Sequence, residues 1–412
     1  MKKKFLIPFI IIILIFSSIY IFRVNIYETL PKNYQSVLKV IFSNKINTIR
    51  LNNDYNVKFL PETQFSYFNF NKVNLNINNI TNSAYGNFIK RKSTKTFYID
   101  TYSNEVIVTL SNGEIYKIKI EEILKNKNTL KKIKTNINNT KILDTLIHKD
   151  YLIVTGVENI SDKCKKFIIL KGKIFSNKIT FKKKYLDSNC YQTIQSGRIQ
   201  FDRRLDGFII GTAADILKSK NQEDNKPQDP NSLMGKIIFY DFENHNIKII
   251  SKGHRNILGL ISFNGGILAT ENGPKGGDEI NNIKLGKNYG WPIASYGEKY
   301  KSINANELAY LKSHEDNGYE EPIYSFVPSI GISEIIKLEN SFSKNWKDNF
   351  IVGSLNSRHI YRLKFNNNFN KVLYIEKIYI GERIRDLKYI EEFNIILMAL
   401  EDTGSIGVLS NN

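Results

Sequence analysis

Apolar and polar residues alternate along most of the chain with the two-residue period of β-strands. In the segment 106–120, VIVTLSNGEIYKIKI, apolar residues alternate with lysines after Ser111-Asn112-Gly113, which supplies the turn of a hairpin. The segment 359–380, HIYRLKFNNNFNKVLYIEKIYI, repeats this pattern around an asparagine-rich turn. Further short strands are predicted at 207–210, 236–240, 247–250, 266–269 and 349–352, and a short helix at 304–314. Many short strands are typical of an all-β sandwich, barrel or propeller, and their spacing alone does not choose among these.

The N-terminus has the pattern of a membrane anchor. Lysines at positions 2–4 precede an uninterrupted run of apolar or small residues from Phe5 to Phe22, close to the ~20 residues that span a bilayer. The run lacks an A-x-A cleavage pattern, so we expect an uncleaved signal anchor. With the lysines in the cytoplasm, the chain after Arg23 is expected on the periplasmic or extracellular side. The predicted organisation is an anchor, a stalk or lead-in and a folded domain, at 1–25, 26–60 and 61–412.

Composition and charge narrow the class of protein. Of the 412 residues, 42% are hydrophobic and 24% are charged, which is the balance of a globular domain with a sizeable core. The net charge of +19 would favour nucleic acid or an anionic membrane surface if it were focused. Lysines such as Lys163, Lys165 and those at 182–184 are scattered between strand-like runs, however. We therefore expect a solvated surface and no nucleic-acid partner.

The chain has two cysteines, Cys164 and Cys190, 26 residues apart. A metal site would need further soft or imidazole ligands, and no histidine lies near either cysteine in the sequence. A disulfide fits an oxidising compartment, and two unpaired buried thiols remain the alternative.

One glycine-rich segment has the pattern of a ligand-binding loop. The segment 269–292, ATENGPKGGDEINNIKLGKNYGWP, is expected to form a loop after a strand that ends at Ala269. Glycines allow the close backbone approaches that are needed when carbonyl oxygens bind a ligand. Ca²⁺ accepts backbone carbonyls together with carboxylates, which Asp278 and Glu279 provide. An elaborate turn without a metal is the alternative.

Together with GHRN (253–256), this segment resembles the soluble quinoprotein sugar dehydrogenases, also called the glucose/sorbosone dehydrogenase family. The resemblance covers residues 190–410 well and 60–190 poorly. It continues through IQSGRIQFD (194–202), DPNSLMGKI (229–237), FVPSIGISEI (326–335), VGSLNSRHIYRLKF (352–365) and ERIRDL (382–387).

The resemblance implies a six-bladed β-propeller whose central depression holds pyrroloquinoline quinone (PQQ) bound to Ca²⁺. In that family a base takes the proton of the sugar's anomeric hydroxyl while hydride passes to a quinone carbonyl that an arginine and calcium polarise. By position, Arg255 and Asn256 match the residues that contact the quinone. Gly273 and Pro274 match the two backbone carbonyls that hold its calcium.

Two further pairs of positions match the family. Arg383 and Arg385 match the arginines that grip the carboxylates of the cofactor. Glu279, with the carbonyl of Tyr289, matches a second, structural calcium site. Arginines suit PQQ because its three carboxylates accept charge-assisted hydrogen bonds.

The chain also departs from the family's pattern. The catalytic histidine of the H-x-x-G-R motif is replaced by Ile194, which cannot accept a proton. The acidic partner of that histidine falls on Ala213, with Asp215 two residues on as a substitute. A cofactor-contacting lysine becomes Asn356, and His254, which belongs to GHRN, is expected to be structural. The losses lie on the side of substrate and proton abstraction.

Two functions remain open from the sequence. The first is a membrane-tethered, PQQ- and Ca²⁺-dependent aldose dehydrogenase that passes electrons to a separate acceptor, since the chain has no c-type haem motif. The second is a propeller that binds carbohydrate or a partner without oxidising it. Loss of a general base costs ~10² to 10⁴ in rate, so weak activity is compatible with Ile194.

Overall fold

The computed structural model describes residues 58–59, 68–77, 96–175, 177–214, 225–298, 310–339 and 342–411. They belong to one compact unit, 48–81 and 94–412, and the other unit, 1–47 and 82–93, lies outside the described residues. The predicted anchor and most of the predicted stalk therefore also lie outside them. No helix within the described ranges has both the length and the apolar character to cross a membrane.

The described chain is almost entirely β-structure. Its eight-stranded sheet joins two antiparallel meanders, β3 to β6 and β7 to β10, through parallel pairing of β6 with β10. The strands of the first meander are β3 (Phe97–Tyr102), β4 (Glu105–Leu110), β5 (Ile115–Lys119) and β6 (Lys131–Thr135). The strands of the second are β7 (Thr140–His148), β8 (Tyr151–Ser161), β9 (Cys164–Phe175) and β10 (Lys178–Leu186).

Three more meanders follow in the order of the chain, each as its own sheet. The first contains β11 (Gly197–Asp202), β12 (Gly207–Thr212), β13 (Lys236–Tyr240) and β14 (Ile247–Lys252). The next contains β15 (Ile257–Phe263), β16 (Gly266–Glu271), β17 (Asp278–Asn282) and β18 (Tyr324–Phe326). The third contains β19 (Ile332–Lys337), β20 (Phe350–Ser354), β21 (His359–Phe365) and β22 (Val372–Tyr379), with β1 (Lys58–Phe59) parallel to β22.

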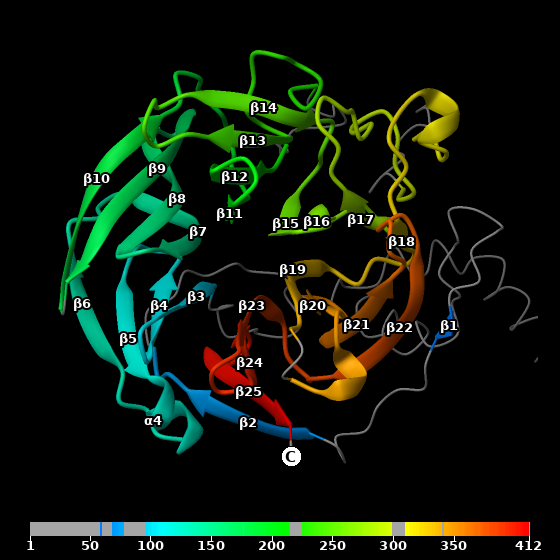
Figure 1. The fold of residues 1–412 in the computed structure, drawn as a ribbon. Coiled ribbons are helices and arrows are strands. Elements are labelled where there is room, and N and C mark those ends of the chain that lie inside the picture. Colours follow the sequence, from blue (N-terminus) through cyan, green and yellow to red (C-terminus); the bar gives the residue numbers. More distant parts are fainter. Residues whose placement is uncertain are drawn as a thin grey trace, which may run out of the picture. The chain divides into compact units, whose positions relative to one another are not determined.

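The last sheet closes the structure by combining both ends of the described chain. It contains β23 (Ile384–Ile390), β24 (Ile395–Leu400), β25 (Ser405–Asn411) and, outermost, β2 (Phe68–Asn74). The first strands of successive meanders contact one another in a closed cycle, β3, β7, β11, β15, β19, β23 and β3 again (Figure 1). Meanders that radiate from such a ring form a β-propeller. The described helices are short, namely α4 (Ile120–Leu124), η2 (Glu315–Asn317) and η3 (Lys344–Trp346).

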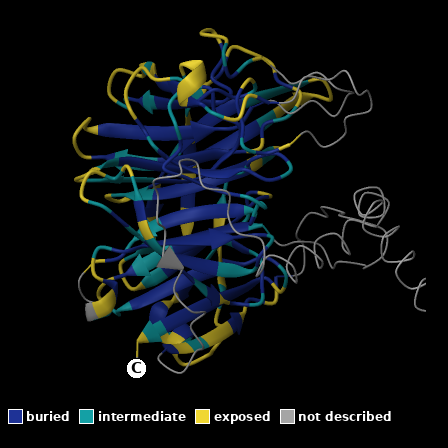
Figure 2. Ribbon diagram, turned by 90° about the vertical axis from the view of Figure 1, so that its right-hand side faces the viewer, coloured by how far each residue is buried: buried dark blue, intermediate teal, exposed yellow. Residues whose placement is uncertain are grey.

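Burial explains why the sequence forms these strands. All six residues of β24 are buried, because alternate side chains enter the clusters on its two faces. The outer strand β10 instead alternates exposed and buried residues at its start, since only one of its faces is covered. Figure 2 shows the same distribution, with buried strands and exposed loops.

Several elements predicted from the sequence are confirmed. Both predicted hairpins are present as β4–β5 and β21–β22. The disulfide is present between Cys164 and Cys190, at the start of β9 and beside the isolated bridge between Lys165 and Tyr191. The predicted helix at 304–314 falls partly outside the described residues, and 310–314 are not helical.

A buried guanidinium joins the inner strands at the centre of the ring. Arg198 of β11 is 3% exposed, and its Nη1 lies 2.9 Å from Asp144 Oδ1, 2.8 Å from Glu334 Oε2 and 2.9 Å from Asp386 Oδ1. Its Nε donates to the Leu258 carbonyl at 2.6 Å. One side chain therefore connects β11 to β7, β19, β23 and β15.

The sixth inner strand joins the same network. Lys388 of β23 lies 2.9 Å from Asp100 of β3, and the Ile99 amide of β3 donates to Asp386 Oδ2 at 2.8 Å. Thr145 Oγ1 of β7 donates to Asp100 Oδ2 at 2.7 Å. Asp100, Asp144, Glu334 and Asp386 thus share two cations, so the network has more carboxylates than positive charges.

This surplus of carboxylates sets the protonation of the network. Burial raises the pKa of Asp144 to about 7 and that of Glu334 to about 8, although the charge of Arg198 opposes both shifts and Asp386 adds to them. A carboxyl whose pKa is raised by folding binds a proton more tightly in the folded state. Its contribution to stability is complete below the ordinary pKa and is lost as the pH rises through the folded pKa.

We predict that Glu334→Gln stabilises the fold more at pH 8 than at pH 5. The substitution removes a carboxyl that must be ionised in the interior above its folded pKa. The difference between the two pH values should be at least about 1 kcal/mol, the equivalent of one pKa unit. Urea unfolding of both proteins at pH 5 and pH 8 measures it, with the exposed Glu392→Gln as control. An equal effect of Glu334→Gln at both pH values would contradict this interpretation.

Candidate functional site

Several of the predicted cofactor-binding residues lie at one end of the ring. Arg198 and its partners Leu258, Glu334 and Asp386 lie within the first three residues of β11, β15, β19 and β23, so these strand starts surround one end of the axis. Asn256 immediately precedes β15, and Arg383 precedes β23. We call this end of the ring the strand-start end. Hydrogen bonds between its loops link the neighbouring site residues, as described below.

Arg255 and Asn256 are both buried at this end. Arg255 Nη1 donates to the Gly273 carbonyl at 2.8 Å, and the guanidinium lies 5.2 Å from the centre of the Trp291 ring. Asn256 forms an isolated bridge with Ala213. Arg255 Nε and Asn256 Oδ1 are buried without a hydrogen-bond partner among the described residues. A donor and an acceptor are therefore left for a polar ligand.

The glycine-rich segment folds differently from the expected loop. β16 continues to Glu271, and β17 begins at Asp278, so Glu279 lies on a strand and not in a loop. Between these strands the chain turns sharply, and a Cβ on Gly273 would lie 2.1 Å from the Gly277 carbonyl oxygen. Asp278 Oδ1 accepts from the Gly273 amide at 2.9 Å. This packing requires glycine and fixes the direction of the carbonyls at 273 and 274.

Arg383 and Arg385 share one buried carboxylate. Glu401 Oε2 lies 3.1 Å from Arg383 Nε, and Glu401 Oε1 lies 2.6 Å from Arg385 Nε. Thr96 Oγ1 also donates to Glu401 Oε1, at 2.8 Å. Although burial opposes the shift, Arg385 and Arg383 lower the pKa of Glu401 to about 2. Two guanidiniums with one carboxylate leave a net positive charge at this end of the ring.

Two more side chains belong to the surroundings of this arginine pair. Asn356 lies beside Gly331, since a Cβ on that glycine would be 2.8 Å from the Asn356 Cβ, and Arg383 Nη1 donates to the Leu355 carbonyl at 3.0 Å. Lys141, the second residue of β7, was not predicted from the sequence. Desolvation by the surrounding protein and the charge of Arg385 lower the pKa of this lysine, although its side chain remains exposed to solvent. Its only signal would have been its position at the start of an inner strand.

The positions expected to carry the base have a different character. Ile194 is 3% exposed and packs in the apolar cluster that includes Leu143, Phe167 and Met234. Asp215 lies outside the described residues. His254 is fully buried between Ser251 Oγ at 2.8 Å and Glu271 Oε1, so both of its ring nitrogens are engaged as in a structural histidine.

The predicted structural-calcium residues lie in a second, acidic cluster. Glu279 Oε1 is 3.9 Å from His314 Nε2, and Tyr289 stacks on His254 with ring centres 4.6 Å apart. Burial and the nearby Glu271 raise the pKa of Glu279 well above its ordinary range. No group of three or more His, Cys, Asp or Glu in the described part of the chain is arranged to hold a metal ion.

Comparison with known proteins gives a consistent result. The family model described as Glucose / Sorbosone dehydrogenase matches residues 97–408. The aldose sugar dehydrogenase YliI of Escherichia coli K12 is 26% identical over 227 residues, which cover 51% of this chain and 58% of that protein. The matched segments span less than two thirds of the curated relatives.

Solved structures share the fold at low sequence identity. The soluble aldose sugar dehydrogenase of Escherichia coli in its apo-form has a TM-score of 0.67 at 19% identity and covers 84% of this chain and 100% of that chain. The PQQ-bound form of the aldose sugar dehydrogenase from Streptomyces coelicolor has a TM-score of 0.59 at 15% identity, covering 84% and 98%.

We predict that Glu401→Gln destabilises the protein by about 1.5–3 kcal/mol, because it removes the charged partner of two arginines. The lowered pKa of Glu401 means that this contribution is present above the ordinary carboxyl range and is lost as the pH falls toward 2. The loss should therefore be constant between pH 5 and pH 8 in urea unfolding. A loss that varies across this interval would show that Glu401 is not ionised as the geometry requires.

Proposed function

Because the chain belongs to the glucose/sorbosone dehydrogenase family, we propose that it is a PQQ-dependent quinoprotein of the aldose sugar dehydrogenase class. Its substrate would be a small aldose, oxidised at the anomeric carbon. We count each of the four-stranded meanders, including both halves of the eight-stranded sheet, as one blade of a six-bladed propeller. We further propose that the domain is exported, tethered by its N-terminal segment, and served by a separate electron acceptor.

The observation that carries this proposal is the group of cations at the strand-start end. Arg255, Arg383 and Arg385 lie there, with Glu401 as the carboxylate of the arginine pair. The unpartnered Arg255 Nε adds a buried donor. A flat anion with several carboxylates fits such a site better than a neutral sugar alone does, since buried donors need acceptors.

Each residue has a definite task in this proposal. Arg383 and Arg385 would hold carboxylates, and Arg255 would direct its guanidinium at a quinone oxygen. The carbonyls of Gly273 and Pro274 would face the calcium; each accepts one hydrogen bond, from Arg255 and from Ser329 Oγ, and keeps a free lone pair. When bound, PQQ supplies a quinone that accepts hydride, and calcium acts as a Lewis acid. Glu279 and the Tyr289 carbonyl would hold a structural calcium.

A second function is favoured by the packing of Ile194. This residue lies in an apolar cluster, so the position of the family's base offers no proton acceptor. A propeller that retains the cation site but binds carbohydrate or a partner without oxidising it would have this arrangement. The two candidates differ in turnover and not in cofactor binding.

We predict that Arg383→Ala and Arg385→Ala each weaken PQQ binding by about 10- to 100-fold, the loss expected for one charged hydrogen-bond partner. Calorimetric titration of the full-length protein with PQQ, with and without Ca²⁺, measures the change. The matched control is Arg204→Ala, which removes an arginine paired with Asp202 at the opposite end of β11. Unchanged affinity in both test variants would remove the basis of the cofactor site.

We also expect the PQQ-loaded protein to reduce a dye in the presence of aldoses, at a rate about 10² to 10⁴ below that of a relative with an intact base. The Escherichia coli aldose sugar dehydrogenase, assayed in parallel, provides the reference. Cofactor binding without any sugar-dependent reduction would reject the dehydrogenase and favour the non-oxidising propeller.

A further inference from the structure

Three adjacent outer strands form a surface rich in lysine. β6, β9 and β10 contain three, four and four lysines and neither Asp nor Glu. In Figure 1, β6 and β10 lie on the outside of the ring. From the sequence we expect lysines such as Lys163, Lys165 and those at 182–184 to be scattered between strand-like runs. The pairing of β6 with β10 adds a feature that the sequence did not predict, because it places Lys134 beside Lys178.

The register of these strands puts five of their eleven lysines on one face. Lys178 pairs with both Lys134 and Phe175, and paired residues in a sheet point to the same side. Residues two apart on one strand also share a face. The resulting outer basic face consists of Lys134, Lys171, Lys173, Phe175, Lys178, Thr180 and Lys182.

The other side of the same strands is fixed in the core. Ile133, Ile174, Ile179 and Phe181 are buried in one apolar cluster. The strands therefore cannot turn the lysines inward without exposing this cluster. The outer basic face is a rigid feature of the fold.

An exposed aromatic ring lies among these charges. Phe175 is 60% exposed, and it forms the last pair of the β9–β10 hairpin with Lys178. Lys173 Nζ lies 5.3 Å from the centre of its ring. Phe175 is thus a large apolar side chain that is exposed at the end of a hairpin, close to Lys173 and Lys178. Exposed aromatic and cationic side chains together are typical of contacts with a membrane interface.

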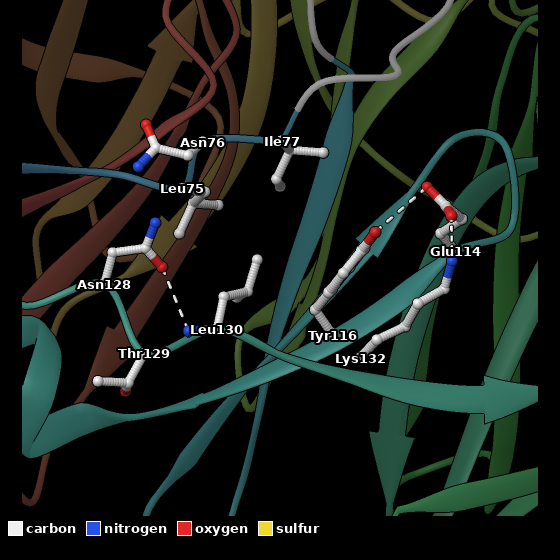
Figure 3. A pocket seen from close by; sticks show the side chains of 9 residues that line it. All are labelled: Leu75, Asn76, Ile77, Glu114, Tyr116, Asn128, Thr129, Leu130 and Lys132. Atoms are coloured by element: carbon white, nitrogen blue, oxygen red, sulfur yellow. Dashed lines mark hydrogen bonds and ion pairs between the residues drawn. The ribbon is translucent and has the colours of Figure 1, made fainter.

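The charges of this face are not neutralised within the described structure. No ion pair joins its five lysines to a carboxylate of the described residues, and the half-buried Lys171 instead lies over the rings of Tyr151 and Phe242. Lys132, by contrast, pairs with Glu114 beside a cavity of about 560 Å³, where Tyr116 also bonds that glutamate (Figure 3). We therefore leave Lys132 outside the outer basic face.

We propose that the outer basic face docks on an anionic phospholipid bilayer, with Phe175 entering the headgroup region. Each lysine near an anionic bilayer strengthens association by about fivefold. The predicted anchor at the N-terminus would hold the domain close to lipid, which makes a bilayer the nearest extended anion. This surface is distinct from the strand-start end, so the proposal does not depend on quinone binding.

The test places a reporter at the centre of the face. Full-length protein carrying Phe175→Trp is mixed with vesicles of phosphatidylcholine alone, or of an equal mixture with phosphatidylglycerol, and recovered by flotation. Quenching by lipid spin-labelled near the headgroup reports contact, and the unsubstituted protein gives the background of buried Trp291 and Trp346. We expect quenching in anionic vesicles, weaker quenching in neutral ones, and its loss in about 1 M salt, where the Debye length is about 3 Å.

Two charge-matched triple variants separate the face from net charge. The first triple variant combines Lys134→Gln, Lys173→Gln and Lys178→Gln. It should shift the docking equilibrium about 100-fold toward the undocked state. The control variant combines Lys119→Gln, Lys248→Gln and Lys347→Gln, which removes the same charge from exposed sites outside the outer basic face. It should leave quenching unchanged. Equal loss in both triples, or equal quenching in neutral and anionic vesicles, would overturn the proposal. So would binding to a DNA oligonucleotide that needs the same lysines, with no dependence on lipid.

Discussion

The guanidinium of Arg198 lies where the inner strands of the ring converge, and its ion pairs and hydrogen bonds reach four of the other five. Transfer of a charge into a protein interior is costly unless hydrogen-bonded partners surround it. Here Asp144, Glu334 and Asp386, from three different sheets, provide those partners. The cost of burial can be offset only when all these strands are in place. The network therefore favours one relative arrangement of the sheets over other ways of packing similar apolar strands.

The same network supports the end of the ring that carries the candidate site. Arg198 Nη2 donates to the Arg385 carbonyl at 2.8 Å, so it holds the backbone of a strand whose first residues belong to the cation group. Arg385 in turn reaches Glu401 with its side chain. The network around Arg198 has a surplus of carboxylates that retain protons, whereas the strand-start end has a surplus of guanidiniums. In the proposed function, arginines that are already held in place would reduce the ordering cost of binding an anionic cofactor.

Local patterns account for much of the fold, and non-local pairing accounts for the rest. The β4–β5 hairpin follows from two-residue alternation around Ser111-Asn112-Gly113, because both signals lie within one short segment. The sequence motifs likewise predicted both Arg255 and Gly273 as site residues, and in the structure Arg255 donates a hydrogen bond to the Gly273 carbonyl. The meeting of β6 with β10 was not predictable, because alternation reveals which face of a strand is buried but not which strand lies beside it. The effect of Arg385 on the pKa of Lys141 was missed for the same reason, since the two residues are far apart in the sequence.

Ile194 occupies the position where the sequence motif predicts the catalytic histidine of the family. Its side chain belongs to a cluster with Leu143, Phe167 and Met234, drawn from three strands or their connections. An imidazole at this position would be buried among hydrocarbon side chains, where its charged form is disfavoured and its nitrogens lack partners. A working base there would require polar replacements among these neighbours as well. The apolar character of position 194 is therefore a property of the whole cluster, whereas the cation group across the strand-start end keeps the residues that suit an anionic cofactor.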